Sequence, residues 1–135
     1  MSTTRPTSEY LLLFRGACWD EGLSPEELER TMARVTAWFE GIRQQGKVKG
    51  GQPLAGEGRI VSGKKGHGVA DGPFAESKEA VGGYLMVEAR DLEEATALAR
   101  SCPTLEYDIT IEVRPVLDEC PIFKRARERL FVATA

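Results

Sequence analysis

Two segments of the chain, residues 10–14 and 84–89, carry apolar side chains at nearly consecutive positions. Successive side chains of a strand point to opposite faces, so each segment is apolar on both faces when it is extended. The pattern predicts two central strands that lie beside each other in one sheet. A third segment, residues 107–113, alternates apolar and polar side chains and ends at Pro115, which is typical of a half-buried strand.

The first predicted helix begins after Ser24. This serine is followed by Pro25 and Glu27, which place a proline at the first helical position and a carboxylate within reach of the cap amide. Gly46 is placed to end the helix. Between these ends, apolar residues recur every three or four positions and predict a single stripe: Leu28, Met32, Val35, Phe39 and Ile42.

The second predicted helix follows Asp91, a favourable cap residue, and cannot continue through Pro103. Its apolar face is narrow and consists mostly of small side chains, which permits a close approach to a sheet: Leu92, Ala95, Leu98 and Ala99. Between the two helices, residues 47–72 are rich in glycine. We expect two or three short strands there, including a hairpin that turns near residues 63–66.

The order of these elements is strand, helix, strands, strand, helix, strand. It favours an α+β fold with a ferredoxin-like sheet and both helices packed on one face. Two helices cover only one face, yet the two central strands are apolar on both. A second copy of the chain is therefore expected against the open face, giving a homodimer. The alternative is that the C-terminal segment covers this face.

The length and the net charge of the chain exclude several classes of protein and of partner. The chain has 135 residues and is 41% hydrophobic, which fits one domain with a real core. A net charge of -3 gives no general attraction to nucleic acid or to an anionic membrane, so neither is expected as a partner.

The apolar run at residues 10–14 is too short for an export signal or a membrane span. Three widely spaced cysteines suggest reduced thiols, and we expect a cytoplasmic protein.

One motif points to a family. Residues 71–79 read Asp-Gly-Pro-Phe-Ala-Glu-Ser-Lys-Glu, and they are followed by Gly-Gly-Tyr at residues 82–84 and by Val-Arg-Pro-Val at residues 113–116. This arrangement resembles the DGPF-motif branch of the YCII-related family, over about residues 10–116. Residues 1–9 would then be a loosely held N-terminus, and residues 117–135 a tail that can form a short basic amphipathic helix. The resemblance implies a dimeric α+β barrel, in agreement with the order of the elements.

The resemblance also implies a candidate site. Some relatives are regarded as enzymes because a histidine and an aspartate share a cleft, and one is a dehydrochlorinase that acts on a chlorinated aromatic ring. Asp71 matches the motif aspartate, but the usual histidine would fall near Gln52, which cannot act as a base. His67, the single histidine, precedes Asp71 by four residues, roughly 13 Å in an extended strand, so the two cannot form a direct dyad within one strand.

The candidate catalytic residues are thus Asp71 and His67, and the candidate ligand-binding residues are Gln52, Asp71, Phe74 and Tyr84. Asp71 can instead serve to build the turn, and His67 can be an exposed hairpin residue. No cluster of His, Cys and carboxylates has the spacing of a metal site, and no metal or cofactor is expected.

Three functions remain open at this point. The first is an accessory, non-catalytic dimeric domain with a small-ligand cleft near the DGPF turn. The second is a lyase or isomerase that uses Asp71 as acid or base, assisted by Tyr84, Tyr107 or His67. The third is a module that binds another protein through its basic C-terminal tail.

Overall fold

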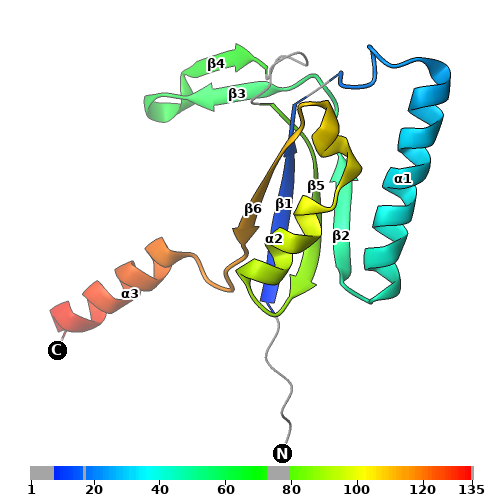
Figure 1. The fold of residues 1–135 in the computed structure, drawn as a ribbon. Coiled ribbons are helices and arrows are strands. Elements are labelled where there is room, and N and C mark those ends of the chain that lie inside the picture. The colour runs from blue at the N-terminus through cyan, green and yellow to red at the C-terminus, as the bar shows by residue number, and fades with distance from the viewer. Residues whose placement is uncertain (1–7, 17, 73–79, 135) are drawn as a thin grey trace, which may run out of the picture.

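The two strands with apolar residues on both faces lie side by side at the centre of a four-stranded antiparallel sheet (Figure 1). The computed structural model describes residues 8–16, 18–72 and 80–134. Strand β1 (Ser8–Arg15) pairs with β5 (Val81–Ala89), and the edges are β2 (Val48–Pro53) and β6 (Thr110–Pro115). The order β2-β5-β1-β6 is that of a ferredoxin-like sheet, which confirms the predicted fold class.

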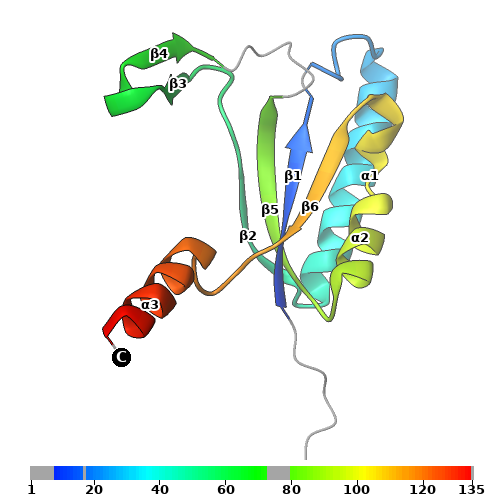
Figure 2. The same ribbon diagram turned by 90° about the vertical axis from the view of Figure 1, so that its left-hand side faces the viewer.

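Both predicted helices are present, and they pack on the same side of the sheet (Figure 2). Helix α1 (Pro25–Gln44) begins with the expected capping box: Ser24 Oγ accepts from the Glu27 amide at 3.2 Å, and the Glu27 carboxylate accepts from the Ser24 amide at 3.1 Å. Helix α2 (Leu92–Arg100) is capped by the Asp91 carboxylate, which accepts from the Glu94 amide at 2.8 Å. These local signals were sufficient to place both helix starts.

The core lies between the helices and the near face of the sheet. Small residues of α2 let that helix lie close to β1 and β5, as predicted. The stripe of α1 differs from the prediction at one place, because Met32 is 44% exposed whereas Thr31 is 2% exposed. The buried core residues come from two strands and both helices: Tyr10, Leu12, Ile42, Leu85, Val87, Ala89, Ala95 and Ala99.

The last strand begins later than the alternating pattern predicted. Pro103–Tyr107 forms a short 3-10 helix, η2, and Asp108 takes a left-handed backbone conformation with φ 68° before β6 starts at Thr110. Tyr107 lies in η2 instead of the strand, and its hydroxyl is bonded to Thr31 Oγ1 of α1, at 3.0 Å. Such a contact distant in the sequence is not visible in the local strand pattern.

The glycine-rich segment forms a separate two-stranded sheet. Strands β3 (Arg59–Ser62) and β4 (Gly68–Asp71) pair across a turn that contains the short helix η1 (Lys64–Gly66), so the predicted hairpin is confirmed. The C-terminal residues form α3 (Pro121–Thr134). Figure 2 shows the hairpin and α3 projecting on the side of the main sheet that α1 and α2 leave uncovered.

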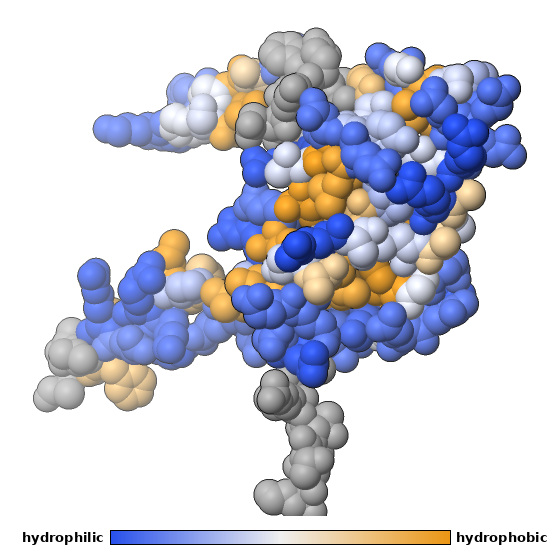
Figure 3. Space-filling model, viewed as in Figure 1, coloured by the Kyte–Doolittle hydropathy of each residue, from blue (hydrophilic) through white to orange (hydrophobic). Residues whose placement is uncertain are grey.

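The surface seen in Figure 3 is mixed in character. Apolar atoms gather over η2 and α2 in the middle of the view, and hydrophilic residues surround them on α1 and α3. Within the described residues, none of the helices combines the length and the apolar character that a bilayer-spanning segment requires.

Candidate functional site

A cavity of about 810 Å³ lies between α1 and the β2 edge of the main sheet. Helix α1 contributes Val35, and the loop after β1 contributes Cys18 and Asp20. The rest of the wall comes from residues 50–56 and 80–85, together with Cys102 and Thr104 near η2. Aromatic side chains dominate the lining on the helix side: Phe14, Trp19, Trp38 and Phe39.

Strand β2 forms part of the cavity wall and carries no side chains at Gly50 and Gly51. Gly51 is paired with Leu85 of β5. The close pairing of the two strands excludes a side chain at position 51, since a Cβ there would lie 2.7 Å from the carbonyl oxygen of Tyr84. At the other end of β2, Val48 has a side chain and packs against the core. The strand therefore contributes little side-chain volume to the cavity at its two glycines.

Trp38 forms a fixed wall of the cavity. Its indole Nε1 donates to the Leu98 carbonyl at 3.0 Å and to Ser101 Oγ at 2.9 Å, which joins α1 to α2. Its ring meets Phe14 edge to face, with centroids 6.3 Å apart and planes at 84°. The orientation of this indole is thus set by polar and aromatic contacts before any ligand enters.

Trp19 is held on the other side of the cavity. Its ring stacks on Tyr107, with centroids 5.5 Å apart, and the Tyr107 hydroxyl is bonded to buried Thr31. The preceding residue, Cys18, has φ 59°, a conformation that turns the chain sharply after β1. These contacts position Trp19 although it lies in a loop.

Polar groups at the cavity are few. The Cys102 thiol and the Thr104 hydroxyl lie 3.1 Å apart and satisfy each other. Among the described residues that line the cavity, Asp20 is the one with a charged side chain. The same part of the chain holds no group of three or more His, Cys, Asp or Glu placed to bind a metal ion. The chemistry on offer is therefore mainly apolar and aromatic contact.

The structure divides the sequence-predicted site residues into two groups. Gln52 and Tyr84 border the cavity and are cross-strand partners on β2 and β5. Strand alternation places their side chains on the face opposite Leu85, so they adjoin the uncovered side of the sheet. Asp71 and His67 lie on the hairpin and do not line the cavity. Phe74 lies outside the described residues.

Asp71 occupies the end of β4. Its carboxylate forms an ion pair with Arg59 Nη1 across the hairpin, at 3.1 Å, and its side chain is 80% exposed. His67 follows η1 and is also exposed. Gln52 and Tyr84 line the cavity, whereas neither Asp71 nor His67 does.

Sequence reasoning missed the two tryptophans. Trp38 lies three residues after Val35 and four before Ile42, so the helical period that identified those two residues also includes it. No sequence pattern identified Trp19, because it lies in a loop without a helical or strand period. Its position depends on the contact with Tyr107, which is distant in the sequence.

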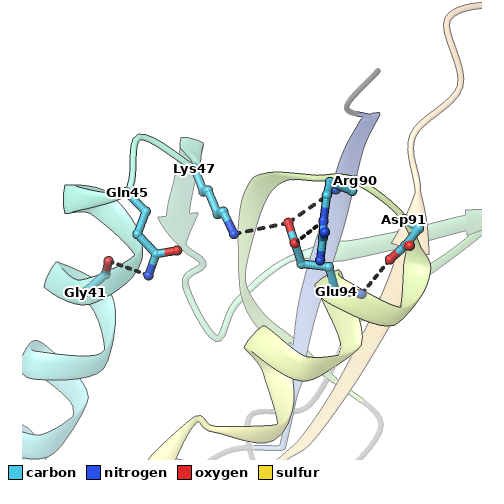
Figure 4. A network of polar contacts seen from close by, with 6 residues as sticks. All are labelled: Gly41, Gln45, Lys47, Arg90, Asp91 and Glu94. Carbon is cyan, nitrogen blue, oxygen red and sulfur yellow. Dashed lines mark hydrogen bonds and ion pairs between the residues drawn. The ribbon is translucent and has the colours of Figure 1, made fainter. Parts of the chain in front are cut away.

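A separate polar network joins the start of β2 to α2 (Figure 4). Glu94 accepts from Lys47 Nζ at 3.1 Å and from Arg90 Nε at 2.7 Å. The hydrogen bond from Lys47 is the main cause that lowers the pKa of Glu94, with the Arg90 backbone and side-chain bonds acting in the same direction. This network stabilises the fold and does not border the cavity.

The family model described as "YCII-related domain" matches residues 4–119. No curated protein sequence matches the chain significantly. Among solved structures, the chain is similar to 5-chloro-2-hydroxyhydroquinone dehydrochlorinase (TftG) from Burkholderia phenoliruptrix AC1100, in complex with 2,5-dihydroxybenzoquinone. The two are 14% identical with a TM-score of 0.48, over 82% of this chain and 95% of that one.

Proposed function

Since this chain belongs to the YCII-related domain family, we propose that it is a cytoplasmic, dimeric domain that binds a small ligand with an apolar ring or chain in the cavity beside α1. The observation that carries the proposal is the cavity of about 810 Å³ with aromatic walls held in place. Pockets of this size and lining are typical of small-molecule sites.

The position of the sequence-predicted acid or base favours binding over catalysis by that residue. General acid and base catalysis needs a titratable group within hydrogen-bond reach of the reacting atom. The candidate base Asp71 lies on the exposed hairpin and is paired with Arg59. For Asp71 or His67 to act on a ligand at the sheet, a second copy of the chain would have to bring the two surfaces together. The alternative, a lyase or isomerase that uses Asp71, rests on that arrangement.

The homodimer is supported by the uncovered face of the main sheet. Strand alternation places four partly exposed apolar side chains there, in two cross-strand pairs: Leu11 with Met86 and Leu13 with Tyr84. Helix α3 projects away from this face instead of covering it (Figure 2). A second copy would remove these side chains from water.

The hairpin supports the same arrangement. Val61 and Val69 are cross-strand partners and are 64% and 59% exposed. An isolated two-stranded hairpin is only marginally stable in water, so this one is expected to pack against another surface. Helix α3 projects on the same side of the sheet (Figure 2), and its Ile122 and Phe123 are similarly exposed. We therefore assign α3 to the dimer contact in preference to a separate partner protein.

The ligand site can be tested with N-phenyl-1-naphthylamine, a neutral probe whose fluorescence rises in apolar surroundings. Val35→Trp fills the cavity from α1 and should weaken probe binding at least about tenfold, or about 1.4 kcal/mol. The matched control is Thr36→Trp, on the exposed side of the same helix turn, and it should bind the probe as the wild type does. Equal affinity for all three proteins would refute the assignment of the cavity, provided that both variants unfold at the wild-type temperature.

A further inference from the structure

The described lining of the cavity contains an acidic side chain and no basic one. Of the described residues that line it, none is Lys, Arg or His, whereas the exposed acid Asp20 is among them. Two basic side chains on the elements that form the cavity have carboxylate partners. Arg34 is bonded to Glu106 at 2.8 Å, and Lys49 pairs with Glu88 at 3.1 Å.

An anionic ligand would find no cationic side chain in the described lining of this site. A carboxylate or sulfonate that enters an apolar cavity loses its hydration, and this cost is recovered only through a cation or several hydrogen-bond donors. Here the Trp38 indole N–H is already committed to Leu98 and Ser101. The negative charge of Asp20 in the lining repels an anion, which disfavours anionic ligands further.

The same lining favours a cationic ligand. The faces of tryptophan and phenylalanine attract cations, and Asp20 supplies a formal negative charge beside them. The two tryptophans are held from outside, Trp38 by α2 and Trp19 by the stack on Tyr107. A planar ring can enter between such walls with little further loss of side-chain freedom.

We infer that the cavity selects neutral or cationic aromatic molecules against anionic ones, with Asp20 as the residue that sets the preference for charge. This inference rests on the proposed function, because it specifies the class of ligand for the same cavity. It is independent of the dimer and of any reaction.

Three probes with one ring system and different charges test the inference: 2-naphthalenemethanol, 2-naphthylmethylamine and 2-naphthoate. Each is titrated into the full-length protein by calorimetry at pH 7 and low ionic strength, where charge effects are least screened. The amine and the alcohol should bind at least about tenfold more tightly than the carboxylate. Asp20→Asn should weaken the amine about threefold or more and leave the alcohol unchanged.

The control is Glu21→Gln, which removes the same charge from the adjacent exposed residue that does not line the cavity. It should leave the order of the three affinities unchanged. Equal binding of the carboxylate and the amine would overturn the charge preference while leaving ligand binding intact. Equal loss of amine affinity in both variants would overturn the role of Asp20. Failure of all three probes would instead count against the proposed function itself.

Discussion

The indole N–H of Trp38 donates to the backbone carbonyl of Leu98, 3.0 Å away, and this bond joins the two helices at the wall of the cavity. The same nitrogen lies 2.9 Å from Ser101 Oγ. One side chain therefore contributes both to the packing of α1 on α2 and to the shape of the candidate site. Changes at this residue should affect stability and binding together.

Trp38→Phe keeps an aromatic ring and removes the donor. We expect the free energy of unfolding to fall by about 1–3 kcal/mol, because a partly buried carbonyl loses a partner and packing is reduced. Probe affinity should fall as well. Urea unfolding measures the first effect and fluorescence titration the second. An unchanged urea midpoint would show that the bond does not join the helices in solution.

Thr31→Val should loosen the loop that carries Trp19. It removes the hydroxyl partner of Tyr107 at a buried position, with an expected loss of about 1 kcal/mol. Because Tyr107 supports the Trp19 ring, the near-ultraviolet circular dichroism signal should decrease too. A double-mutant cycle with Tyr107→Phe isolates the pair. Fully additive effects of the two substitutions would contradict the coupling.

The Lys47 and Glu94 contact predicts a pH dependence of stability. The hydrogen bond from Lys47, followed by those from Arg90, holds the pKa of Glu94 below its ordinary value in the folded state. A lowered folded pKa stabilises the protein above the unfolded pKa, about 4.3, and this contribution is lost as the pH falls through the folded value.

Glu94→Gln should therefore destabilise the protein at neutral pH and reduce the loss of stability on acidification below about pH 5. Urea midpoints measured at several pH values test this. Glu93→Gln, on the exposed side of α2, controls for the removal of one negative charge. Parallel pH profiles for wild type and Glu94→Gln would rule out the contribution of this group.

If the uncovered face of the main sheet forms the dimer contact, a charged substitution on that face should weaken the dimer. Leu13→Asp places a charge among the apolar side chains of that face and should shift a dimer toward monomer. Sedimentation velocity at about 10 μM, a concentration at which many specific dimers are populated, measures the shift. Ala37→Asp on the exposed side of α1 is the control. A wild-type protein that sediments as a monomer would refute the homodimer.

Removal of residues 117–135 separates the role of α3 from that of the sheet face. If α3 contacts the second copy, the truncated protein should dimerise more weakly than the full chain. An unchanged dimer dissociation constant would count against that contact and leave α3 as a surface for another protein.

Asp71→Asn tests the enzymatic alternative. An exposed ion pair contributes little, so the loss of the Arg59 partner should change stability by less than about 1 kcal/mol. Probe binding in the cavity should be unaffected, since Asp71 does not line it. Turnover of a ligand by the wild type that disappears in this variant would instead support acid or base catalysis by Asp71.

Much of the fold could be anticipated from local signals. Ser24 and Asp91 cap their helices as their side chains predict, and the apolar segments around Leu12 and Val87 form the paired central strands. The predicted ligand residues Gln52 and Tyr84 do meet as cross-strand partners. The sequence predicted the hairpin near residues 63–66, but it did not show that the hairpin would hold Asp71 and His67 outside the cavity lining.

The difference has a physical origin. Caps, turns and strand periodicity depend on residues a few positions apart, so the chain encodes them locally and they can be read before folding is considered. The cavity depends on the distance between α1 and β2, on the missing side chain at Gly51 and on the stack of Trp19 with Tyr107. Such contacts join distant parts of the chain, and they acquire a shape only when the helices and the sheet have packed together.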